Sequence, residues 1–272
     1  MKRSILCLIV SAAPVVMCCG AAQAREWKPA GERTCSAEHF HVNDLIGYAE
    51  SREQRLANGS TNFIDPGQNG SIHVHGWNNA DVLVTACIHT AASTDAAARA
   101  LASQVTIAQG AGMIKPSGPS TNEQSYWNVS YDVWVPSASN LDLKASNGSI
   151  AVETVRGQIH FQTLNGSVHL NEVGGDVEGS TTNGSLLIDV AGSGWSGNGL
   201  RAQTTNGSVR LNLPENFSAQ VQASTVNGRI KVDFPVTLSG EVGKTMSFQL
   251  GGGGPLIEAK TVNGSVHISR KA

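Results

Sequence analysis

Thr163-Leu164-Asn165-Gly166-Ser167-Val168 decides the fold, because the same pattern recurs along the second half of the chain. Copies stand at Thr181–Leu186, Thr204–Val209, Thr225–Ile230 and Thr261–Val266, and a looser one at Ala145–Ile150. Their turn positions are Asn147, Gly148, Asn165, Gly166, Asn183, Gly184, Asn206, Gly207, Asn227, Gly228, Asn263 and Gly264. Successive asparagines are 18, 18, 23, 21 and 36 residues apart, the last gap being two units of 18. A period of this size predicts a repeat architecture.

Each unit of the repeat contains two short alternating segments. In the first unit Ile150 and Val152 alternate with polar or small residues, a turn follows at 155–157, and Ile159 and Phe161 continue the alternation. Such alternation is typical of half-buried strands. Asn-Gly tolerates the left-handed backbone of a tight turn, so we expect that conformation at each motif.

Two all-β architectures fit these units. Asn-Gly between alternating strands is a hairpin signal, which indicates an antiparallel meander or sandwich. A β-solenoid of about 18-residue coils competes, because stacking places identical side chains about 4.8 Å apart in columns. Such columns can form a hydrogen-bonded Asn ladder, and an inward Thr column can do the same. In-phase repetition of the motif favours the solenoid, since hairpins give no reason for it.

The first half of the chain is less regular. We expect strands at 71–75, 81–88 and 126–135, and a short strand near Phe40 and Val42. Helices are predicted over Asp44–Ala57 and over about 93–109, where an alanine-rich run follows candidate N-cap residues. The expected organisation is a signal peptide at 1–24, an N-terminal extension at 25–60 and a solenoid domain at 61–270 with the second helix inserted.

The N-terminus has the features of an export signal. Lys2 and Arg3 precede an apolar run that ends in Ala22-Gln23-Ala24, a signal-peptidase pattern. A lipoprotein signal ending at Cys18 or Cys19 is the weaker alternative, since Met17 stands where a small residue is expected. We expect an exported protein that is periplasmic, cell-surface or secreted, with no transmembrane segment.

The net charge and the cysteines indicate which partners are excluded and whether a disulfide is expected. Removal of the signal takes the net charge from −2 to −4, which argues against nucleic acid as a partner. Cys35 and Cys87 then remain as an even pair in an oxidising compartment, so a disulfide between them is expected. Two unpaired thiols are the alternative.

Two irregular turns are candidate contact surfaces. The coil that contains Trp195 is lengthened by about five residues, and 232–254 lacks the motif and includes Gly251–Gly254. Because insertions in solenoids are often binding loops, Trp195 is a candidate surface contact; the alternative is that it folds back onto the coil. Charges in Ser269–Lys271 are expected to discourage strand addition at an open end.

The histidines and carboxylates, which could act in catalysis or bind a metal, form no recognisable catalytic set. His73 and His75 share one face of a strand at a chelating spacing, with His39 and His41 in the sequence before them. His169 and His267 fall in a column with Ala151, Leu187, Arg210 and Lys231, which indicates a solvated face. The carboxylates are scattered in phase: Asp142, Glu153, Glu172, Asp176, Glu178, Asp189 and Asp233. No catalytic residue, metal site or cofactor is therefore predicted.

The repeated Thr-x-Asn-Gly-Ser/Arg-apolar units, together with Gly157-Gln158-Ile159, Gly175-Asp176-Val177 and the opening Gly70–Trp77, resemble the putative adhesin domain family of bacterial envelope proteins, long a domain of unknown function. The resemblance covers roughly residues 60–270. It implies an exported, solenoid-like β domain without known catalytic residues.

The expected function is therefore non-enzymatic. The leading hypothesis is an adhesin-like or envelope-associated binding or scaffold protein, with an envelope polysaccharide or surface protein as partner. Self-assembly through solenoid ends or edges is a second hypothesis. A carbohydrate-active β-helix enzyme is the third, and it would need acids clustered on one face.

Overall fold

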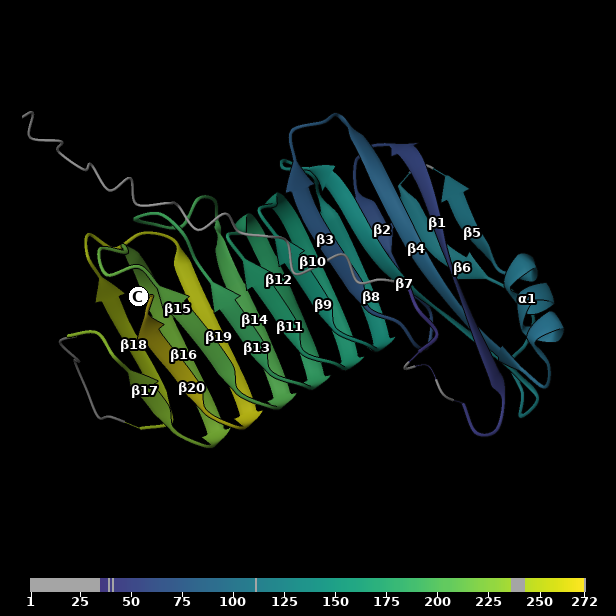
Figure 1. Ribbon diagram of the computed structural model, residues 1–272. Helices are drawn as coiled ribbons and strands as arrows, with labels where there is room; N and C mark the ends of the chain where they lie inside the picture. The colour runs from purple at the N-terminus through teal and green to yellow at the C-terminus, as the bar shows by residue number, and fades with distance from the viewer. Residues whose placement is uncertain (1–34, 39, 41, 111, 236–242, 272) are drawn as a thin grey trace, which may run out of the picture. The chain divides into compact units, whose positions relative to one another are not determined.

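The computed structural model describes residues 35–271 apart from 39, 41, 111 and 236–242. The expected signal peptide, the residues up to Thr34, and His39 and His41 lie outside the described part. The described chain forms two ten-stranded sheets, here called sheet A and sheet B (Figure 1). In spatial order, sheet A contains β1 (Ile46–Ala57), β4 (Asp81–Ala92), β7 (Ser125–Pro136), β3 (Ile72–Trp77), β9 (Ile150–Glu153), β11 (Val168–Asn171), β13 (Leu186–Asp189), β15 (Val209–Leu213), β20 (Val266–Arg270) and β17 (Ile230–Val232). Sheet B contains β18 (Thr245–Leu250), β16 (Ala219–Asn227), β19 (Leu256–Asn263), β14 (Gly199–Asn206), β12 (Gly174–Asn183), β10 (Arg156–Asn165), β8 (Leu141–Asn147), β2 (Asn62–Ile64), β6 (Met113–Ser117) and β5 (Thr106–Gly110).

Parallel stacking of the repeats confirms the β-solenoid and contradicts the meander. β10 pairs with β12 so that Thr163 lies beside Thr181 and Asn165 beside Asn183. β11 pairs with β13 in the same way on the other sheet. Inward side chains such as Phe161 and Leu170 are fully buried in a core that both sheets share. The solenoid begins one coil earlier than the clear repeats, because β3 pairs in parallel with β9.

The asparagine column forms the expected ladder. Side-chain amides donate from each Asn to the next along the order Asn227, Asn263, Asn206, Asn183, Asn165, Asn147 and Asn69, at 2.7–3.0 Å. The threonine column behaves differently from expectation. The Thr163 hydroxyl donates to the Gly148 carbonyl oxygen at 3.0 Å, and four other motif threonines repeat this contact. Each threonine therefore satisfies a corner carbonyl of its neighbouring coil.

Close stacking, and not a left-handed turn, requires the motif glycines. None of the six has a φ in the left-handed region, so the expected conformation is wrong there. A Cβ built on Gly166 would instead lie 2.0 Å from the Gly148 carbonyl oxygen. Corners of adjacent coils approach so closely that a side chain has no space.

The coils do not stack in chain order at the C-terminal end. β19 pairs with β14 on one side and β16 on the other, and β20 likewise lies between β15 and β17. The 36-residue gap is therefore not two stacked coils, because Asn227 and Asn263 are neighbours in the ladder. In the sequence between Asn227 and Asn263, the chain forms β18, which pairs antiparallel with β16 and is the last strand at this end of sheet B. Ser269 and Arg270 belong to β20, an interior strand, and Lys271 follows it, so the expectation that their charges protect an open end is wrong.

The first half of the chain extends both sheets. The strands expected at 71–75, 81–88 and 126–135 are present as β3, β4 and β7. The helix expected at 44–57 is wrong, because β1 pairs residue for residue with β4 in an antiparallel ladder. The other helix, α1 (Asp95–Gln104), is capped by Thr94 and ends before residue 109. Val105 is extended, and β-branched Thr106 and Ile107 enter β5. A disulfide joins Cys35 to Cys87 on β4, as expected.

Candidate functional site

The outward face of sheet A gathers the titratable side chains of several strands. Strand register places His73 between Asp132 of β7 and Ala151 of β9. Two residues further along, His75 lies between Trp134 and Glu153. The first of these rows continues through His169, Leu187, Arg210, His267 and Lys231, which confirms the expected column.

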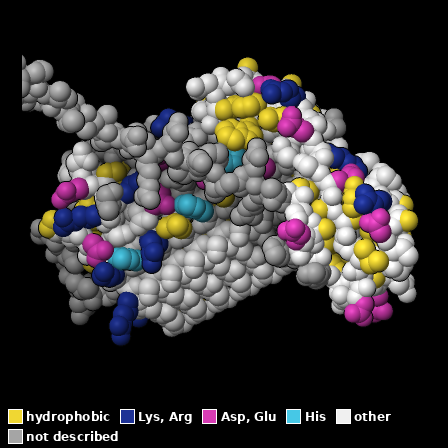
Figure 2. Space-filling view, in the orientation of Figure 1, with side chains coloured by type: hydrophobic (Ala, Val, Ile, Leu, Met, Phe, Trp, Pro, Cys, Tyr) yellow, Lys and Arg dark blue, Asp and Glu magenta, His cyan; other side chains and the backbone are white. Residues whose placement is uncertain are grey.

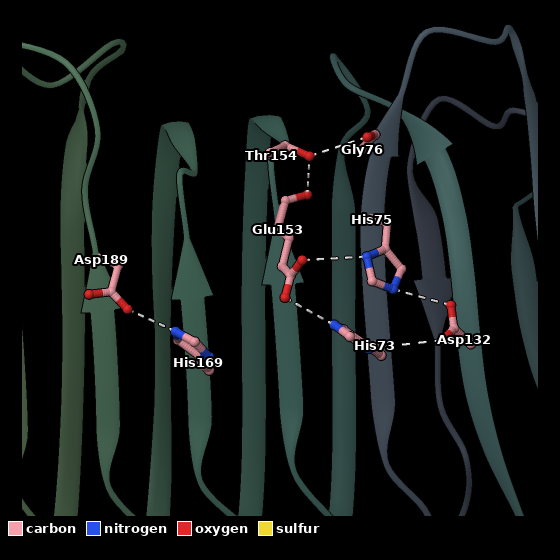
Figure 3. Close-up of polar contacts among 8 residues, drawn as sticks. All are labelled: His73, His75, Gly76, Asp132, Glu153, Thr154, His169 and Asp189. Carbon is pink, nitrogen blue, oxygen red and sulfur yellow. Dashed lines mark hydrogen bonds and ion pairs between the residues drawn. The ribbon is translucent and has the colours of Figure 1, made fainter. Parts of the chain in front are cut away.

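His73, His75, Asp132 and Glu153 form one cluster (Figure 3). Glu153 Oε1 lies 3.3 Å from His73 Nε2, and Glu153 Oε2 lies 3.6 Å from His75 Nδ1. On the other side, Asp132 Oδ1 lies 3.2 Å from His75 Nε2, and Asp132 Oδ2 lies 3.9 Å from His73 Nδ1. Two carboxylates therefore enclose two imidazoles whose ring centroids are 3.9 Å apart.

This cluster is more buried than its outward position suggests. The side chains of His75, Glu153 and His73 are 5%, 11% and 14% exposed. Burial, followed by the nearby His75, lowers the pKa of His73 below its ordinary value, and the neighbouring carboxylates only partly oppose this. The His75 ring stacks on Trp134 at a centroid distance of 4.4 Å. Neutral imidazoles held between carboxylates are the donor set that transition metals prefer.

The other histidine–carboxylate pairs on this face are simpler. His169 Nε2 lies 2.9 Å from Asp189 Oδ2, and the His169 side chain is 43% exposed. His267 Nε2 lies 2.7 Å from Asp233 Oδ2. Hydrogen bonding from His267, followed by that from Lys231, lowers the pKa of Asp233. Each pair has one imidazole, so neither offers a second nitrogen ligand.

A groove lies next to Asn69, the residue at one end of the Asn ladder. Its volume is about 350 Å³, and its lining includes Gln68, Asn69, Tyr126, Trp127 and Asn128. Trp127 is held in place, because its Nε1 donates to the Pro119 carbonyl oxygen at 2.7 Å. The groove thus combines a fixed aromatic ring with amide groups.

Trp195 is not a surface contact, so that prediction is wrong. The side chain belongs to the core, the residue is 6% exposed, and Nε1 donates to the Gly175 carbonyl oxygen at 3.0 Å. The lengthened coil leaves space that the indole fills. Gly251–Gly254 form the turn between β18 and β19, with left-handed φ values at Gly251 and Gly253.

Sequence reasoning missed that Asp132 and Glu153 meet the two histidines. One signal was present: Asn69-Gly70-Ser71-Ile72 is itself a copy of the motif, in register with Asn147-Gly148-Ser149-Ile150. That alignment places His75 beside Glu153. No comparable signal existed for Asp132, because β7 lies outside the repeat.

The face of the molecule drawn in Figure 2 has mixed charge. Figure 2 shows both signs interspersed, and a broad area without charged or hydrophobic side chains where strands such as β10 and β12 end. The motif Asn, Gly and Ser residues form these corners. Within the described residues, no helix has the length and apolar character needed to span a bilayer.

Similar solved structures include a "putative cell adhesion protein" of Clostridium sporogenes ATCC 15579, at 10% identity and a TM-score of 0.42, covering 82% of this chain and 100% of that one. A "putative adhesin" of Bacteroides fragilis NCTC 9343 matches at 10% identity and a TM-score of 0.39, covering 82% and 97%. A "putative lipid binding protein" of Parabacteroides distasonis ATCC 8503 matches at 8% identity and a TM-score of 0.31, covering 81% and 96%. At these TM-scores the likenesses carry no argument about function.

No curated protein matches the chain. A family profile described as Toastrack DUF4097 matches residues 67–269, which are most of the sequence and nearly all of the solenoid. The expected resemblance to a domain family of unknown function is thereby confirmed. The chain belongs to the Toastrack DUF4097 family.

Proposed function

We propose that the protein is an exported, non-catalytic envelope protein that binds an extended envelope polysaccharide. The groove bounded by Gln68, Asn69, Tyr126, Trp127 and Asn128 carries this proposal. Sugar rings have apolar faces that pack on aromatic rings, and hydroxyl edges that exchange hydrogen bonds with amides. The groove offers both kinds of group side by side.

The solenoid supports the same role beyond the groove. Asn69 accepts a hydrogen bond from Asn147 and so joins the groove to the Asn ladder. The corners that follow are rich in amides and hydroxyls, and Arg229 is the only charged residue at the Ser position of the motif. An extended polymer that enters the groove would find a repeated polar surface along its length.

Self-assembly through sheet ends is less well supported. Beyond β3 sheet A continues into the antiparallel strands β7, β4 and β1, and the antiparallel β18 closes sheet B. Among the described strands, three of the four sheet ends are antiparallel and lack the parallel register that end-to-end stacking of coils needs, and only β17 pairs in parallel. A surface protein as partner remains the alternative that the binding experiment separates.

The proposal is tested by titrating a panel of purified envelope polysaccharides into the chain by isothermal titration calorimetry. We expect Tyr126→Ala to weaken binding by about 5- to 30-fold, since loss of one aromatic contact removes about 1–2 kcal/mol. Tyr48→Ala is the matched control, because Tyr48 lies on β1, packs against Arg99 and does not line the groove. Equal weakening by both variants, or binding of a surface protein but of no polysaccharide, would contradict it.

A further inference from the structure

The cluster on sheet A has an unusual arrangement of proton donors and acceptors. Glu153 faces one nitrogen of each imidazole, His73 Nε2 and His75 Nδ1. Asp132 faces the other two nitrogens, His73 Nδ1 and His75 Nε2. A neutral imidazole carries one N–H and one lone pair. If both N–H groups point to Glu153, both lone pairs point to Asp132.

That arrangement places acceptors against acceptors on the Asp132 side. Asp132 Oδ1 is buried and has no hydrogen-bond partner, although His75 Nε2 lies only 3.2 Å away. A buried carboxylate oxygen without a hydrogen bond is costly. A bound cation, or a proton on the imidazole nitrogen that faces Asp132, would relieve the cost.

We propose that His73, His75 and Asp132 bind one divalent transition-metal ion, with Zn²⁺ as the preferred ion, and that Glu153 orients both imidazoles. One ligand atom from each of the three residues lies within 4.8 Å of the other two. Zinc–nitrogen bonds of about 2.0–2.1 Å place the donors of a tetrahedral site about 3.4 Å apart. Small side-chain movements would therefore close the three ligands around an ion.

The donor set selects the class of ion. Imidazole nitrogen with a carboxylate suits zinc and related transition metals, whereas Mg²⁺ and Ca²⁺ favour oxygen ligands. A second carboxylate that accepts from the far nitrogens of metal-bound histidines is the usual support of such sites. Two neutral imidazoles and two carboxylates carry a charge of −2, which a divalent ion neutralises.

Three protein ligands leave a fourth position open for water or for a group of a binding partner.

The ligands come from β3 and β7, and Glu153 comes from β9, so the ion would connect three adjacent strands (Figure 3). These strands join the regular coils to the antiparallel extension of sheet A. None of the four residues lines the groove, so this proposal does not depend on polysaccharide binding.

The test uses the full chain, purified without an affinity tag, kept oxidised, and stripped with EDTA. Zn²⁺ is titrated in competition with a chromogenic chelator. We expect one Zn²⁺ per chain, at least tenfold weaker binding in Asp132→Asn, and about 10–100-fold weaker binding in Glu153→Gln. His169→Gln is the matched control, because His169 pairs with Asp189 on the same face without a second imidazole. Absence of binding in the wild type, or equal affinity in Asp132→Asn and the wild type, would overturn the site.

A second measurement needs no variant. Long-range ¹H–¹⁵N spectra of the wild-type chain report each imidazole as Zn²⁺ is added. We expect His73 and His75 to shift at one equivalent while His169 and His267 stay in place. Shifts confined to other histidines would overturn the site even if the variants fail to fold.

Discussion

At the scale of single residues, the motif glycines set how closely the coils approach. Gly166→Ala is expected to destabilise the protein by about 2–4 kcal/mol, because its Cβ would meet the Gly148 carbonyl oxygen at 2.0 Å and the backbone would have to separate. Urea unfolding followed by circular dichroism measures the loss. Gly252→Ala is the control, since its Cβ would have no atom within 4 Å. Similar unfolding midpoints for the two variants would show that the corners are looser than described.

At the scale of the element, the Asn ladder acts as a chain of donors and acceptors. Asn183→Asp removes the donor to Asn165 and places a carboxylate against its amide oxygen, across a contact of 2.7 Å in the wild type. We expect a loss of about 1–2 kcal/mol at neutral pH. Repulsion raises the folded-state pKa of the new carboxyl, so the loss should shrink as pH falls through that pKa, and it should vanish below the unfolded value of about 3.9. Urea unfolding at pH 7 and pH 4 measures this.

Asn216→Asp serves as the control, because Asn216 is exposed and outside the ladder. An equal loss in both variants, or a loss that does not depend on pH, would mean that the ladder contributes nothing specific.

Elements within the repeat were predictable, whereas outside it β4, β7 and α1 were predicted correctly but β1 was not. The phase of Asn165 and Asn183 was enough to predict parallel stacking and the ladder, because only stacked coils require it. β1 was predicted as a helix, because its polar and charged residues lack the alternation typical of a strand, and its partner β4 is distant in sequence. The two histidines were found, but their partner Asp132 was not, because pairing of β3 with β7 follows from tertiary structure.

At the scale of the whole molecule, the final coil supports the coil that precedes it in sequence. Truncation after Gly254 removes β19 and β20, on which β16 and β17 pack. We expect β16, β17 and β18 to become sensitive to protease while the coils up to β15 stay protected, with the full-length chain as control. Limited proteolysis with mass spectrometry measures this. Continued protection of these three strands would mean that β16 can dock directly onto β14.

The coil formed by β19 and β20 lies between two others, and this position limits how the stack of coils can become longer. In a solenoid whose coils follow chain order, duplication of a terminal repeat adds one more coil at the free end. Here the chain returns inward and its last strands are enclosed on both sides. A repeat appended after β20 would find no open strand beside it. Growth by duplication is therefore restricted to the interior repeats, such as those of β10 and β12.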